Sequence, residues 1–189
     1  MGDFGGGIVS ETEKGRWVRS PNDEVLKSHP RLAEFLPFLD VLNGESPRGG
    51  VLVAASFLEN LLLKVIQSFL VEGKQQEQIL SGFNAPIGTL SAKIALAAAL
   101  GLISERERRE CDLVRKIRNK FAHNVHPTFS DDDVQSLCFE LSYRAMPYEG
   151  VDVDAKGSFT SAAVSLISNL TNRPHYAAQA RLRTREWPL

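Results

Sequence analysis

Apolar positions recur every three or four residues along most of this chain, which predicts α-helices. The longest such segment, Val51 to Glu72, is apolar on most of its sides, so we expect it to be the central helix. The other expected helices lie between Gly, Pro and N-capping residues, at 21–28, 30–43, 75–80, 90–100, 104–123, 134–143 and 158–172. No segment shows a convincing strand pattern. The sequence therefore predicts an all-α, single-domain helical bundle of about six to seven helices.

Two segments of different composition flank the predicted bundle. Residues 1–20 are rich in glycine and lack periodicity, so we expect a flexible N-terminal arm before a bundle domain at 21–172. Pro174 is expected to end the last helix and to leave residues 173–189 as an Arg-rich C-terminal tail. That tail carries Arg181, Arg183, Arg185 and Trp187. It could bind phosphate or stay disordered.

The overall composition is that of an ordinary globular protein. With 22 basic and 23 acidic residues the net charge is −1, so any nucleic-acid role must rest on a local patch. Cys111 and Cys138 are not arranged as a CxxC pair and indicate reduced thiols in a cytoplasmic protein. No signal-peptide pattern opens the sequence. Charged residues interrupt the apolar segment 51–71, which argues against a simple membrane span.

The segment 104–123 carries the most chemistry. Ser104 and Glu107 have the spacing of a capping box, which predicts that a helix begins there. One stripe of this helix is apolar and consists of Leu113, Val114, Ile117 and Phe121. At about 100° per residue, Arg115, Asn119 and His123 align on the opposite face, and Arg118 is rotated to one side. The helix thus offers polar side chains beyond what packing requires.

Several segments, read in order, resemble the mannitol operon repressor family of bacterial helical proteins. They are Arg48-Gly-Gly, Ala54-Ala-Ser-Phe-Leu-Glu59, the segment 83–94 from Phe-Asn-Ala-Pro-Ile-Gly onward, the segment 98–103 and Asp112 to His123. The resemblance covers about residues 30–145. It implies a compact HEPN-like bundle, commonly dimeric, with the 104–123 helix near the two-fold axis. The wider HEPN group is marked by an Arg, a polar residue and a His on one helix, here Arg118, Asn119 and His123.

Other HEPN domains are metal-independent ribonucleases, and the resemblance implies how such a site would work here. His123 would act as general base or acid at a ribose hydroxyl. Arg118 would hold the scissile phosphate with its planar guanidinium group, and Asn119 would orient one of these groups. Because Arg118 and His123 differ by about 140° around one helix, a second copy would have to complete the site.

Structural explanations of the same residues stay open. Arg118 and Asn119 could tie the helix to Glu59 or Asp112, and His123 could bind free carbonyl groups at the helix end. The segment 104–120 has seven basic and four acidic residues, a charge pattern that suits an RNA-facing patch or a solvated helix face. From this segment and the long helix we take Arg115, Lys116, Lys120 and Glu59 as candidate binding residues. His123 and His126 lack a third ligand, so we expect no metal and no cofactor.

Two functions follow as hypotheses. The first is a cytoplasmic regulatory protein resembling the mannitol operon repressor, a homodimer acting in transcriptional regulation through a protein or nucleic-acid partner. No motif that reads DNA sequence is recognisable in it. The second is a metal-independent HEPN endoribonuclease, a toxin or defence protein, using Arg118, Asn119 and His123.

Overall fold

The computed structural model describes residues 34–147 and 152–188 of this chain. Those residues form eight helices and no strand, so the all-α prediction is confirmed. The helices are α2 (Phe35–Gly44), α3 (Pro47–Phe69), α4 (Lys74–Leu80), α5 (Leu90–Ala99), α6 (Glu105–His123), α7 (Asp132–Glu140), α8 (Ala155–Thr171) and α9 (Arg173–Gln179). The expected arm at 1–20 and the expected helix at 21–28 lie outside the described residues.

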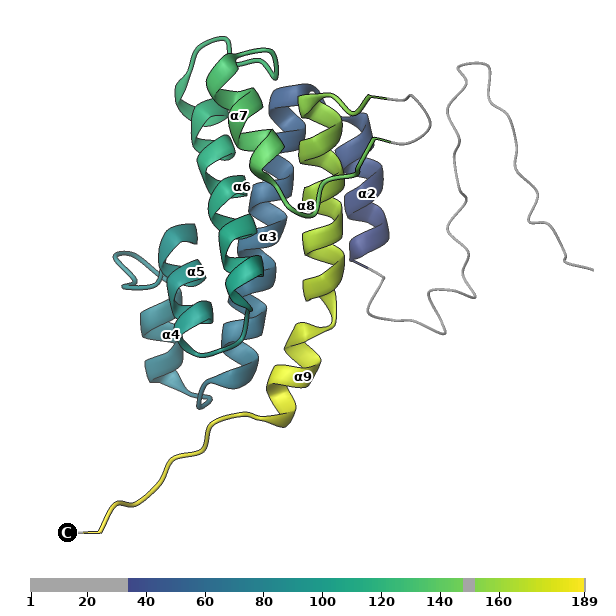
Figure 1. Ribbon diagram of the computed structural model, residues 1–189. Helices are drawn as coiled ribbons and strands as arrows, with labels where there is room; N and C mark the ends of the chain where they lie inside the picture. Colours follow the sequence, from purple (N-terminus) through teal and green to yellow (C-terminus); the bar gives the residue numbers. More distant parts are fainter. Residues whose placement is uncertain (1–33, 148–151, 189) are drawn as a thin grey trace, which may run out of the picture.

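Helix α3 is the centre of the bundle, and α2, α5, α6, α8 and α9 all pack against it (Figure 1). It begins at Pro47, four residues earlier than expected, because the Ser46 hydroxyl accepts a hydrogen bond from the Gly49 amide at 3.0 Å. Val51, Leu62 and Val65 are fully buried. Although α3 is long and apolar enough to cross a membrane by length and composition, these contacts make it a core helix.

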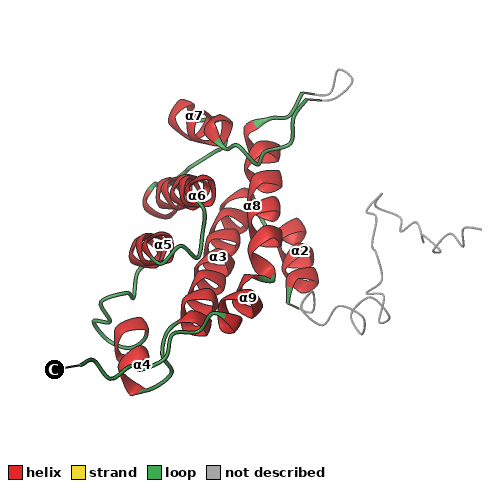
Figure 2. Ribbon diagram, turned by 60° about the horizontal axis from the view of Figure 1, so that its bottom comes forward, coloured by secondary structure: helices red, strands yellow, loops and turns green. Residues whose placement is uncertain are grey.

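Helices α5, α6 and α7 lie in a row on one side of α3, with α2, α8 and α9 on the other (Figure 2). The central member of this row, α6, packs against α3, α5, α7 and α8. Near its end Phe121 contacts Phe129, with ring centroids 4.9 Å apart, and Phe129 contacts Phe159 of α8 at 5.8 Å. These contacts enclose the inner face of α6 and leave its outer face to solvent.

The helical part of the chain continues past residue 172, where we expected the tail to begin. Pro174 does end α8, but it also lies in the first turn of α9, a position where proline is favourable. The Arg173 guanidinium donates to Glu107 Oε1 at 2.7 Å and to the Leu102 carbonyl at 2.6 Å. Helix α9, which packs on α3, is the eighth helix of the described residues and belongs to the bundle.

Candidate functional site

The predicted start and the two faces of α6 are confirmed. The Ser104 amide donates to Glu107 Oε2 at 2.7 Å and the Glu107 amide donates to the Ser104 hydroxyl at 3.2 Å, which completes the capping box. The apolar stripe is buried and consists of Leu113, Val114, Ile117 and Phe121. Of the residues predicted for the opposite face, His123 is exposed, and Arg115 and Asn119 are half-buried.

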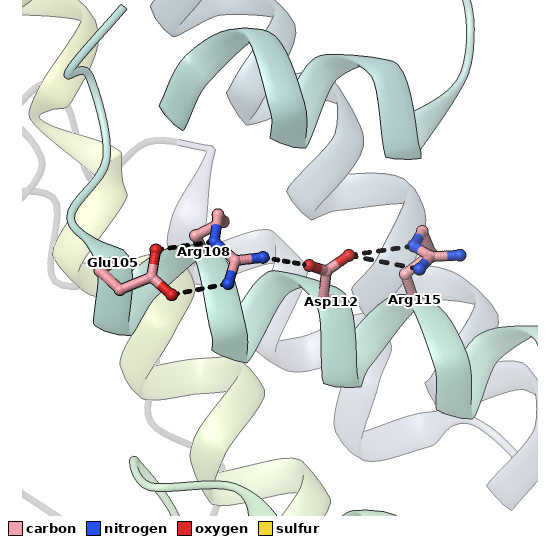
Figure 3. A network of polar contacts seen from close by, with 4 residues as sticks. All are labelled: Glu105, Arg108, Asp112 and Arg115. Carbon is pink, nitrogen blue, oxygen red and sulfur yellow. Dashed lines mark hydrogen bonds and ion pairs between the residues drawn. The ribbon is translucent and has the colours of Figure 1, made fainter. Parts of the chain in front are cut away.

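The first part of the outer face carries a row of alternating charges (Figure 3). Arg108 pairs with Glu105 at 2.6 Å and with Asp112 at 2.8 Å, and Asp112 also pairs with Arg115 at 3.3 Å. The hydrogen bond and charge of Arg108 hold the pKa of Glu105 below its usual range. This charged row, Glu105, Arg108, Asp112 and Arg115, is therefore balanced within the helix, and Arg115 is partly engaged by Asp112.

The second part of α6 carries the residues expected for catalysis. Arg118 Nη1 donates to Asn119 Oδ1 at 3.1 Å, so the amide orients the guanidinium group. Within the described residues Arg118 forms no ion pair with a carboxylate, and it is not tied to Glu59 or Asp112. His123 lies in the last turn and has no hydrogen-bond partner in the described part of the chain. The structure thus brings Arg118 and Asn119 together and places His123 about one turn farther along.

Arg48, at the start of α3, reaches the same end of α6. Its guanidinium group donates to the Ala122 carbonyl at 3.3 Å and to the Val125 carbonyl at 3.4 Å. Ala122 lies in the last turn of α6 and Val125 just beyond its end, where free carbonyls attract a cation. Sequence reasoning did not predict this role, although Arg48-Gly-Gly is one of the segments that carry the family resemblance. Arg48 adds a cation beside His123.

The remaining predicted binding residues differ in whether they form ion pairs within the bundle. Lys116 is exposed and pairs with no carboxylate of the described residues. Lys120 pairs with Asp133 of α7 at 2.5 Å and, mainly through this bond, lowers the pKa of that carboxyl group. Glu59 Oε1 accepts from the buried Lys93 of α5 at 2.7 Å. Lys120 and Glu59 therefore join helices within the bundle.

Taken together, the C-terminal half of α6 and the start of α3 present cations that no carboxylate of the described residues neutralises. We call the cations Arg48, Lys116 and Arg118, with Asn119 and the imidazole of His123, the α6-end surface; Lys116 and Arg118 lie on opposite flanks of its outer face, about 160° apart around the helix. Guanidinium and ammonium groups without carboxylate partners favour an anionic ligand, such as a carboxylate or a phosphate. Within the described residues no group of three His, Cys, Asp or Glu side chains could hold a metal ion.

No family model matches the chain, and no curated protein matches it. Among solved structures, MtlR of Escherichia coli, in the X-ray structure of its complex with HPr, matches with a TM-score of 0.54 and 24% identity. The match covers 77% of this chain and 99% of that one. The chain thus has a fold similar to that of MtlR, as the resemblance to the mannitol operon repressor family led us to expect.

Proposed function

We propose that this protein is a regulatory module of the MtlR kind, which acts by binding a protein partner. The observation that carries the proposal is the similarity in fold to MtlR, a protein whose structure was solved with HPr bound. The partner proposed here is accordingly an HPr-like protein. A cytoplasmic location and a role in transcriptional regulation belong to the same proposal.

The α6-end surface is the part of the molecule that we propose for this contact. Arg118 and Lys116 are cations without carboxylate partners in the described part of the chain, so acidic groups of a partner that covers the outer face of α6 can approach each of them without breaking an internal ion pair. Complementary charge at an interface speeds association and selects the partner. Lys120 and Glu59 contribute less to this surface because their bonds join helices of one protomer.

Calorimetric titration with HPr encoded in the same genome tests the proposal. We expect saturable binding that Lys116→Glu and Arg118→Glu each weaken about tenfold, because each reversal places like charges together. Lys156→Glu is the matched control, since Lys156 is an exposed cation on α8 and not on α6. Absence of binding to HPr would reject the HPr-like partner, and equal loss in the control would reject the surface.

The charged row of α6 supports a dimer and suggests its register. Turning the helix about a two-fold axis at the level of residue 110 places Glu105 opposite the partner subunit's Arg115. The same rotation places Arg108 opposite the partner subunit's Asp112. An interface across a two-fold axis must be complementary to itself, and this row meets that condition in charge. We propose that two copies associate through α6 in this antiparallel register.

A ribonuclease remains a second candidate because Arg118 is held by Asn119 rather than by a carboxylate. A guanidinium group without a carboxylate partner can bind a phosphate. Arg118 and His123 would still need a second copy to act on one phosphodiester. The antiparallel register above separates the two copies of His123 by about 40 Å along the helices, so a shared site needs an axis near the end of α6 instead.

Incubating the purified protein with RNA in EDTA tests this second candidate. Cleavage that is lost in His123→Ala and in Arg118→Ala, and kept in Lys156→Ala, would establish a metal-independent ribonuclease. Cleavage that survives both substitutions would come from another source. No cleavage at high protein concentration would leave the regulatory module as the function.

A further inference from the structure

The chain after α9 is anchored to the bundle where it leaves the helix and is extended beyond that point (Figure 1). Arg181 Nε donates to the Ser68 carbonyl at 3.0 Å, and Arg181 Nη1 pairs with Glu72 at 2.6 Å. The Leu182 amide donates to the Phe69 carbonyl at 2.7 Å. These bonds fasten the chain to the C-terminal end of α3. We call residues 181–188 the C-terminal arm, and its base is a fixed part of the fold.

Beyond this anchor the arm exposes two cations and a large aromatic ring. Arg183 and Arg185 are exposed and form no ion pair within the described residues, and the Trp187 side chain is 77% exposed. Side chains two residues apart in an extended chain point to the same side and lie about 7 Å apart. Arg183, Arg185 and Trp187 are at this spacing, so a drawn-out arm presents them as one strip.

The strip borders a hollow of about 740 Å³ against the end of α3. Val71 and Leu182 are apolar members of its lining, and the rest consists of Ala180 and other side chains of the arm, among them the half-buried Arg181. A hollow of this volume accommodates a ligand of the size of one or two nucleotides. Its lining offers a flat aromatic surface, apolar side chains and the guanidinium groups of Arg183 and Arg185, beside that of Arg181, which is paired with Glu72.

We infer that this hollow binds single-stranded nucleic acid, with a base stacked on Trp187 and phosphates on Arg183 and Arg185. Proteins that bind single strands combine aromatic platforms for the bases with cations that follow the backbone. An acidic peptide would use the two arginines but would gain little from the indole ring. The exposed tryptophan therefore favours a nucleic acid over an acidic protein segment.

This site is separate from the α6-end surface. Arg48, at the first residues of α3, contacts the end of α6, whereas the arm is fastened to Ser68 and Phe69 at the other end of α3. These two ends of one helix are about 30 Å apart. Binding at the arm can thus be measured independently of any partner at α6.

Fluorescence of Trp187 in the full chain tests the inference. The chain has two tryptophans, so Trp17→Phe leaves Trp187 as the only reporter. We expect saturable quenching by a single-stranded decauridylate. The double variant Arg183→Ala/Arg185→Ala should raise its Kd at least about tenfold. Lys156→Ala is the matched control, because it removes an exposed cation of α8 that does not line the hollow, and it should leave the Kd unchanged.

Three outcomes would overturn the inference. The first is no change in Trp187 fluorescence at the highest soluble concentration of decauridylate. The second is quenching of the same Kd in the double arginine variant. The third is equal binding of a decaglutamate peptide that competes with the oligonucleotide, which would assign the arm to an acidic protein.

Discussion

At the scale of single residues, Glu107 is an enclosed charge, whose side chain is 7% exposed and pairs with Arg173. Arg173→Ala leaves this carboxylate without its cationic partner. We expect the free energy of unfolding to fall by about 2 kcal/mol, since hydrogen bonds to charged groups are worth roughly 1.5–3 kcal/mol. Urea denaturation measures the loss. Lys64→Ala removes an exposed ion pair to Glu34 and should cost less than about 1 kcal/mol.

The same carboxylate gives a dependence on pH. Burial opposes ionisation of Glu107, but hydrogen bonds from the Ser104 backbone and from Arg173 outweigh it and lower the pKa below the usual value. A lowered pKa in the folded state stabilises the protein above the pKa of the unfolded chain, about 4.3, and this contribution is lost as the pH falls through the folded value. The difference in urea midpoint between wild type and Glu107→Gln should therefore shrink as the pH is lowered from neutral to acidic. A difference that stays the same at every pH would contradict this.

The two thiols are expected to be inert in the folded protein. Burial, with nearby carboxylates as a smaller cause, raises the pKa of Cys111 to about 12, and burial raises that of Cys138 to about 12. The thiolate is the reactive form, so very little of it is present near neutral pH. An alkylating reagent should modify both cysteines in urea and neither in buffer, and mass spectrometry measures the modification. Rapid labelling of either one in buffer would contradict the packing of α6 and α7.

At the scale of the elements, α5 ends in a Schellman motif. The Gly101 amide donates to the Ala98 carbonyl at 3.0 Å, and the Leu102 amide donates to the Ala97 carbonyl at 2.9 Å. Gly101 has φ +70°, a left-handed conformation that strains other residues. Gly101→Ala should cost about 1 kcal/mol by thermal unfolding. Gly101→Asn should cost less, because asparagine tolerates this conformation; a greater loss in asparagine would contradict the explanation.

These local signals explain how much of the fold could be predicted. Capping by Ser104 and termination at Gly101 depend on neighbouring residues, so the sequence placed α6 and the end of α5 closely. The role of Arg48 depends on carbonyl groups 74 and 77 residues away, and no local pattern reveals such a contact. Pro174 predicts a break correctly but does not show that a new helix follows. For the site, the faces of α6 were predictable, whereas the engagement of Lys120 and Glu59 in internal pairs was not.

At the scale of the whole molecule, the charged row of α6 makes the proposed dimer testable by exchange of charges. Glu105→Arg or Arg115→Glu alone places like charges opposite each other across the two-fold axis, so each should weaken the dimer about tenfold in sedimentation experiments. The double variant places opposite charges together again and should restore the wild-type dissociation constant. A double variant as weak as the single ones would reject the register, and a monomeric wild type at micromolar concentration would reject the dimer.

The position of α9 on α3 has a consequence for synthesis of the protein. One apolar side of α3 is covered by residues 173–179, which leave the ribosome more than a hundred residues after α3 itself. Until then the nascent polypeptide exposes this apolar surface of α3 and is most prone to aggregate. In a chain that ends just before Arg173, this side of α3 would stay exposed after synthesis, and the tendency to aggregate would persist.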